Sequence, residues 1–200
     1  MAIKSDREYR NLGAFNAESE YIVEGYASTF EPYELLEIDG VKFYEQIDRH
    51  AFDEADMSDV VFLRDHEGRV MARTKNNTIQ LDIDDHGLHQ RTDLSKTQAS
   101  RDMAEDIAVG NYSQMSFAFT VAEDHFDRDT NTRIIDRVRK VFDISAVSFP
   151  ANPQTEIGLS MRDYFNGEIE MIRAERLEAE KRARDLEKLK LRIRLMEENK

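Results

Sequence analysis

Short segments in which apolar and polar residues alternate fill much of the chain up to residue 149, and this period of two limits the fold more than any other feature. Alternating side chains point to opposite faces of a β-strand, so each segment predicts a strand with one buried face. Polar turns at 75–77 and 84–87 join several of them and predict antiparallel neighbours. The predicted strands are residues 20–30, 60–65, 69–75, 78–84, 87–94, 114–124 and 133–149.

Two segments between these strands have helical patterns. Residues 95–111 predict a helix, with Ser95 or Thr97 as its N-cap and Gly110 as its stop. Its apolar stripe consists of Ala99, Met103, Ile107 and Ala108. Residues 50–57 predict a shorter helix. Because strands dominate, the predicted fold class is α+β: a mainly antiparallel sheet or closed barrel with a few surrounding helices and a charged C-terminal helix.

The charged C-terminal segment predicts a separate unit. Asn166 and Gly167 predict a break, so we expect a main domain over 1–165 and a helical tail over 166–200. Apolar residues at seven-residue intervals give the second half of the tail a partial coiled-coil seam. These residues are Ile172, Ala179, Leu186 and Ile193, followed by Leu189 and Met196. The tail is then either a solvated helix that lies on its own domain or frays, or a helix that binds a partner or another copy of the chain.

Composition restricts the chemistry and the partners. The chain has no cysteine, which excludes a disulfide framework, a thiolate nucleophile and cysteine-ligated zinc. Its net charge of −13 opposes nucleic-acid phosphates, and no basic patch offsets it, so we expect no nucleic-acid partner. The first residues lack a signal peptide, and no apolar run approaches the ~20 residues that span a bilayer. We therefore expect a soluble, cytoplasmic protein without a membrane partner.

Two polar clusters resemble metal sites in composition but not in spacing. Residues 127–132 begin like a calcium loop, yet Thr132 replaces the glycine of the sharp turn, so a hairpin loop is the better prediction. Residues 82–89 gather acids and two histidines without a third ligand spaced for zinc. The chain has neither a glycine-rich phosphate loop nor a Gly-x-Ser-x-Gly turn. We expect no metal and no cofactor.

A serine and a histidine are the candidates for chemistry. In the predicted strand 114–124, bulky residues alternate with small ones, and Ser116 belongs to the small, polar face. A serine hydroxyl needs a base to become a nucleophile, and His66 could supply one if its strand lies beside that of Ser116. From the residues alone this pairing is one interpretation among several, because a histidine at a strand end is more often a surface or hydrogen-bonded residue.

Four blocks of the sequence resemble a known family. They are EGYASTF (24–30), FLRDHE (62–67), GNYSQMSFAF (110–119) and VFDISAVSFPANPQTEI (141–157). Their order and character are similar to the prohead maturation proteases of tailed phages, which are structurally akin to the herpesvirus assembly proteases. The resemblance covers roughly residues 10–160. It implies a serine endopeptidase inside the immature capsid, in the host cytoplasm, that cuts the scaffold, extensions of the major capsid protein and commonly itself.

The resemblance also implies site residues. The histidine of the D-H block is the general base of this family and the serine of the M-S block is its nucleophile, which correspond to His66 and Ser116. Asp143 occupies the place of the family's acidic residue. The herpesvirus proteases use a second histidine there, so His125 is the alternative to Asp143.

Two other interpretations stay open at this point. Asp143 could instead face solvent or pair with Arg139 or Lys140, because edge strands carry such charges freely. The whole chain could be a non-enzymatic assembly or scaffold module that binds capsid subunits through its acidic body and helical tail. In either reading, the tail could also join copies of the chain into a homo-oligomer.

Overall fold

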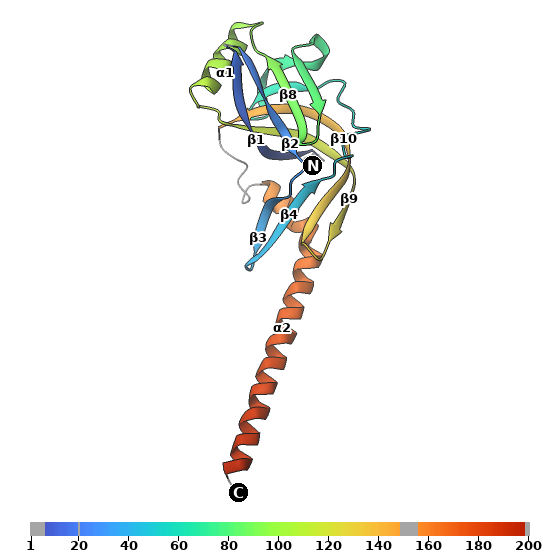
Figure 1. Ribbon diagram of the computed structural model, residues 1–200, viewed down its shortest axis with the longest axis vertical. Helices are drawn as coiled ribbons and strands as arrows, with labels where there is room; N and C mark the ends of the chain where they lie inside the picture. Colours follow the sequence, from blue (N-terminus) through green and yellow to red (C-terminus); the bar gives the residue numbers. More distant parts are fainter. Residues whose placement is uncertain (1–6, 20, 149–155, 199–200) are drawn as a thin grey trace, which may run out of the picture. The chain divides into compact units, whose positions relative to one another are not determined.

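The computed structural model describes most of the chain, namely residues 7–19, 21–148 and 156–198 (Figure 1). The chain divides into two compact units between Ile157 and Gly158. The assignment of a main domain to 1–165 and of a tail to 166–200 stays a prediction.

Ten strands of the first unit form one sheet. Its order is β3-β4-β10-β9-β1-β2-β8-β7, and β5 pairs with β10 and carries β6 on its other side. Most neighbours are antiparallel, but β10 runs parallel to β4 and to β5. The strands are β1 (Glu8–Ser19), β2 (Ile22–Thr29), β3 (Tyr33–Ile38), β4 (Val41–Ile47), β5 (Val61–Arg64), β6 (Glu67–Arg73), β7 (Ile79–Ile83), β8 (Gly87–Asp93), β9 (Gln114–Asp127) and β10 (Thr132–Val147). The α+β class is confirmed, and the described strands do not close into a barrel.

The long β9–β10 hairpin forms the centre of the sheet. Phe117 and Phe119 of β9 stack with ring centroids 4.6 Å apart and belong to the same buried cluster as Ile144 of β10. Residues 128–131 connect the two strands, and Asn131 adopts a left-handed conformation with a φ of 53°. The predicted hairpin loop is confirmed.

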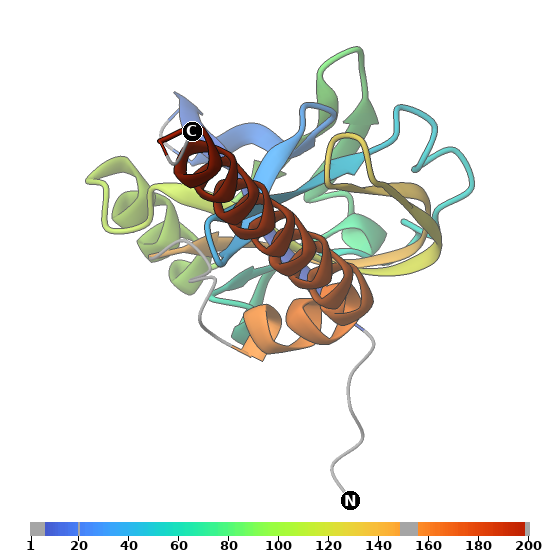
Figure 2. The same ribbon diagram turned by 90° about the horizontal axis from the view of Figure 1, so that it is seen from below.

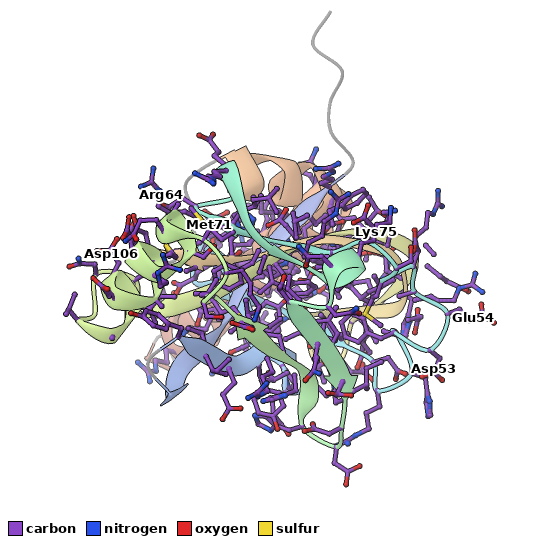
Figure 3. The ribbon with its side chains drawn as sticks, turned by 90° about the horizontal axis from the view of Figure 1, so that it is seen from above. Asp53, Glu54, Arg64, Met71, Lys75 and Asp106 are labelled. Atoms are coloured by element: carbon purple, nitrogen blue, oxygen red, sulfur yellow. The ribbon has the colours of Figure 1, made fainter. Side chains whose placement is uncertain are left out.

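Helix α1 (Gln98–Ala108) follows the sequence prediction closely. Thr97 is the N-cap, and its hydroxyl accepts a hydrogen bond from the backbone N–H of Ser100 at 3.1 Å. Gly110, with a φ of 84°, lies just past the helix end. The hydroxyl of Ser100 donates to the carbonyl of Met71 at 2.7 Å and so fixes the helix beside β6 (Figure 3).

The predicted helix over 50–57 is wrong, because this segment forms turns. Ala51 and Phe52 are buried, whereas Asp53 and Glu54 point outward (Figure 3). At Asp56 the backbone N–H donates to the carbonyl of Arg139 and the carbonyl accepts from Val141, so β10 provides the hydrogen bonds that a further helical turn would have made.

Strands β1, β3 and β4 were not predicted from the pattern. Two of them pair with a distant segment, β1 with β9 and β4 with β10, and β3 is held by its neighbour β4. Such long-range pairing overrides weak local propensity and leaves little trace in a short window of sequence.

The second unit is formed by α2 (Glu156–Glu198), drawn in orange and red in Figures 1 and 2. Asn166 and Gly167 lie inside this helix, so they do not start it as predicted. A glycine within a helix costs only about 1 kcal/mol, which the neighbouring good helix formers tolerate. Ion pairs one turn apart, such as Arg182 with Glu178 at 2.9 Å, support the exposed helix. Among the described residues, no helix is apolar and long enough to cross a membrane.

Candidate active site

The turn between β5 and β6 consists of two residues, Asp65 and His66. Both have left-handed backbones, with φ values of 47° and 61°, as a two-residue hairpin turn of type I′ requires. Residues other than glycine reach this region at a cost of about 1–3 kcal/mol, and Asp and His are among those found there most often. The histidine therefore lies at the tip of a hairpin, just past the end of β5.

Hydrogen bonds hold this turn against the end of β10. The backbone N–H of Asp65 donates to the carbonyl of Ala146 at 2.9 Å, and its carboxylate accepts from the backbone N–H of Ser148 at 3.1 Å. The backbone N–H of His66 donates to the hydroxyl of Ser145 at 3.2 Å. The parallel pairing of β5 with β10 thus continues into the turn and fixes the backbone position from which the imidazole of His66 extends.

The imidazole of His66 joins two polar groups in one chain of hydrogen bonds. Its Nδ1 lies 2.6 Å from Oδ1 of Asp143, and its Nε2 lies 2.7 Å from Oγ of Ser116. A carboxylate only accepts hydrogen bonds, so Nδ1 carries the proton of the first bond. Nε2 then has its lone pair available for the hydroxyl proton of Ser116.

The register of β9 and β10 explains why these groups meet. Ser116 lies directly opposite Ser145, and Ala118 lies opposite Asp143, so all four side chains share one face of the sheet. Three of these side chains are small, which leaves the imidazole room to lie between the serine and the carboxylate. The opposite face of β9 bears Met115, Phe117 and Phe119, which are fully buried.

Burial makes the site partly closed to solvent. Ser116 and Asp143 are each 3% exposed, and the His66 side chain is 17% exposed. A carboxylate with so little solvent needs hydrogen-bond donors, and it has two: Nδ1 of His66 and the hydroxyl of Ser145 at 2.8 Å. The open side of the site is therefore the imidazole.

The two candidates for the third site residue, Asp143 and His125, lie in different parts of the sheet. Asp143 contacts His66, and it does not form the alternative pair with Lys140, whose ammonium contacts Asp56 at 2.7 Å. His125 is 56% exposed and lies nine residues beyond Ser116 on β9, about 30 Å along the strand. Nδ1 of His125 donates a hydrogen bond to the carboxylate of Asp136 at 2.7 Å, and this bond raises the pKa of His125. The catalytic roles of His66, Ser116 and Asp143 stay predictions.

Two residues of this site were not singled out from the sequence: Ser145 and Asp65. Ser145 shares the strand face of Asp143 two positions away, and this alternation was the signal that could have identified it. Asp65 had no comparable signal, because its contact with Ser148 depends on the parallel pairing of β5 with β10.

The acidic segment at 82–89 is used for a turn. One oxygen of Asp84 accepts hydrogen bonds from the backbone N–H groups of His86 and Gly87, and the other accepts from the hydroxyl of Tyr26 at 2.7 Å. Within the described part of the chain, no group of three or more His, Asp or Glu residues is arranged to hold a metal ion.

Comparison with known proteins gave one match. A family model described as caudovirus prohead serine protease matches residues 7–169, which include all ten strands and the three predicted site residues. The comparisons with curated proteins and with solved structures gave no match.

Proposed function

The chain belongs to the caudovirus prohead serine protease family, and from this premise we propose that it cleaves capsid proteins with Ser116 as nucleophile, His66 as general base and acid, and Asp143 as the partner of the imidazole. The observation that carries the assignment is the continuous hydrogen-bond chain from the hydroxyl of Ser116 through His66 to the carboxylate of Asp143.

The reaction proceeds in two steps of acyl transfer. Oγ of Ser116 attacks the carbonyl carbon of the scissile peptide while Nε2 of His66 takes the hydroxyl proton. The resulting imidazolium is stabilised by Asp143 through Nδ1, and it gives its proton to the amine that leaves. Water then attacks the acyl ester, His66 again takes and returns a proton, and the carboxylic acid product departs.

The proposed substrates are the major capsid protein and the scaffold, within the immature capsid in the host cytoplasm. Family membership supports capsid proteins as the partners in general. Cleavage of the chain by itself is part of the proposal, since α2 offers a long and largely exposed segment. Joining of copies through α2 is also proposed, because Leu186 and Leu189 are both more than half exposed on it.

The rival function is a non-enzymatic assembly module. The exposed leucines of α2 favour it, because exposed apolar residues on a helix are typical of a surface that binds a partner. Such a module has no use for a serine, a histidine and a carboxylate joined in hydrogen-bonding order on one buried sheet face. The protease is therefore the function we propose.

A serine-reactive fluorophosphonate tests this assignment without knowledge of the natural substrate. We expect the wild type to be labelled at Ser116, with the adduct located by peptide mass spectrometry, and Ser116→Ala to stay unlabelled. Ser113→Ala is the matched control, because it removes an exposed serine three residues away that lies outside this chain of hydrogen bonds. Equal labelling of the wild type and Ser116→Ala would reject the assignment.

A further inference from the structure

We propose that Ser145 is a positioning residue that holds the imidazole of His66 in its reactive orientation. This inference rests on the proposed function, because it gives His66 the role of the base. Ser145 is fully buried on β10 and lies directly opposite Ser116. It contacts the backbone of His66 and the carboxylate of Asp143, which binds the imidazole of His66.

The hydroxyl of Ser145 makes two hydrogen bonds of opposite sense. It donates to Oδ1 of Asp143 at 2.8 Å and accepts from the backbone N–H of His66 at 3.2 Å. The same Oδ1 accepts from Nδ1 of His66 at 2.6 Å. Backbone, hydroxyl, carboxylate and imidazole therefore form a closed ring of contacts.

This ring fixes the two quantities on which proton transfer depends. The bond to the backbone N–H fixes where the side chain of His66 starts, and the shared Oδ1 fixes the direction in which Nδ1 points. With both ends fixed, Nε2 stays within hydrogen-bond distance of Ser116. The left-handed turn needs such a restraint, because strained backbone persists only where surrounding contacts hold it.

Ser145 is not a second nucleophile in this geometry. Its proton is donated to Asp143, and Nε2, the nitrogen that accepts a proton, faces Ser116. The hydroxyl of Ser145 either orients the imidazole of His66 or only fills buried space. If it orients the imidazole, a side chain of the same shape without a hydroxyl cannot replace it.

Two substitutions separate these roles. Threonine and valine have the same shape, so Ser145→Thr and Ser145→Val crowd the buried site equally, but only threonine keeps the hydroxyl. We expect the limiting rate of fluorophosphonate labelling at Ser116 to be about 100-fold lower in Ser145→Val than in Ser145→Thr. The probe concentration at half-maximal rate should be the same in both, since neither residue is expected to contact the probe.

A spectroscopic measurement reports the imidazole itself. In the wild type and Ser145→Thr, the Nδ1 proton of His66 should give a single far-downfield proton resonance in NMR spectra, because its hydrogen bond to Asp143 is short and protected from solvent. In Ser145→Val this resonance should broaden or move, as the carboxylate loses its second donor. Ser145→Ala, which leaves only a small hole and folds with the least strain, should behave like Ser145→Val in both measurements.

The outcomes distinguish this inference from the proposed function. Equal labelling rates and equal spectra for the threonine and valine variants would overturn the role of Ser145 while Ser116→Ala still abolishes labelling. If threonine and valine both prevent folding, Ser145→Ala decides: wild-type labelling and an unchanged resonance in that variant overturn the role. Persistent labelling of Ser116→Ala would instead overturn the proposed function.

Discussion

At the scale of single residues, the candidate site depends on two adjacent left-handed residues, Asp65 and His66. Neither is glycine, so the fold maintains a strained turn to place one imidazole. The compensating contacts come from β10: Ala146 and Ser148 bind Asp65, and Ser145 binds His66. This arrangement makes Asp65 a structural support for the histidine that follows it.

Substitution of Asp65 should therefore weaken the site without removing any reacting group. Asp65→Asn keeps both the tolerance for a left-handed backbone and an oxygen acceptor for Ser148, whereas Asp65→Ala keeps neither. We expect Asp65→Ala to lower both the melting temperature and the rate of fluorophosphonate labelling, and Asp65→Asn to stay near the wild type. Identical behaviour of the two variants would show that this contact does not support the turn.

The carboxylate of Asp143 gives the second residue-scale prediction. Asn has the same shape but lacks the charge that stabilises the imidazolium, so Asp143→Asn should slow cleavage by roughly two to four orders of magnitude. The variant should fold normally, which circular dichroism and thermal unfolding would check. Asp136→Asn, which changes the partner of the distant His125, is the control and should cleave normally. A normally folded Asp143→Asn that cuts at the wild-type rate would remove Asp143 from the site, and His125 would be tested next.

His66 and Ser116 should act as one unit. Once either is lost, the other cannot transfer or use the proton, so the two single variants and the double variant should fall to nearly the same residual activity. The measurement is cleavage by Ser116→Ala, His66→Ala and their combination at equal protein concentration. Losses that multiply in the double variant would mean that the two residues act independently.

Single residues of the site differ in how far the sequence could predict them. Ser116, His66 and Asp143 came from the resemblance, and strand alternation agreed for two of them. Ser145 was visible only as a neighbour on the face of Asp143. Its two hydrogen bonds depend on strand register and on a turn from a distant segment, and neither can be read from local pattern.

At the scale of elements, a buried ion network joins the first strand to the centre of the sheet. Glu45 of β4 is fully buried and accepts hydrogen bonds from Arg10 of β1, at 2.7 Å, and from Arg133 of β10, at 3.0 Å. Arg133 also contacts Glu8 and Asp124, and the hydroxyl of Tyr33 donates to Glu45. Four strands and the edge strand β3 therefore meet at one carboxylate and its partners.

Removal of the central charge should be costly. Glu45→Gln removes the fully buried anion between two buried guanidinium groups, and we expect a loss of about 3–5 kcal/mol in the free energy of unfolding. Glu34→Gln is the control, because it removes an exposed carboxylate paired with Lys42 and should change stability little. Chemical denaturation would measure both. Equal stability of the two variants would show that the network does not hold the strands together.

The same network predicts a pH dependence of stability. Burial by itself raises the pKa of Glu45, but Arg10 and Arg133 outweigh it, so the net pKa is lowered. A carboxyl whose folded pKa is lowered stabilises the fold above its unfolded pKa, about 4.3 for Glu, and that contribution is lost as the pH falls through the lowered value. Unfolding free energy should thus fall less steeply in this acidic range for Glu45→Gln than for the wild type. Parallel curves would contradict the assignment.

Elements were predictable where local pattern and tertiary structure agree. The strands β5 to β10 and helix α1 have clear periodicity, and the cap at Thr97 formed as expected. The segment over 50–57 failed because backbone groups of β10 bind Asp56. Strand β1 was missed because β9 and the buried partner of Arg10, Glu45, both lie far from it in the sequence.

At the scale of the whole molecule, the two units differ in how they are stabilised. The first has a continuous buried core, and the family match extends over it. Along α2, most described side chains from Glu170 onward are exposed, and the ion pairs are between residues one turn apart. Such surface pairs add little stability, so α2 should be the part of the chain that opens most readily.

Limited proteolysis tests this difference. A low concentration of trypsin should first remove residues of the tail, where Arg and Lys are frequent and exposed, and leave a resistant fragment that contains the ten strands. Mass spectrometry of the fragments over time would identify the order of cleavage. The same time course without trypsin reports self-cleavage, with Ser116→Ala as its control. Early cuts before about residue 160, with the tail intact, would contradict the prediction.

The most direct test of the central claim is cleavage of the natural substrates. The wild type and Ser116→Ala would each be incubated with the major capsid protein and scaffold protein encoded by the same phage, and mass spectrometry would identify new termini. We predict defined cleavage products with the wild type and none with Ser116→Ala, although both variants have the same fold. Identical products from both, or no products from the wild type when it is co-assembled with its capsid, would contradict the account.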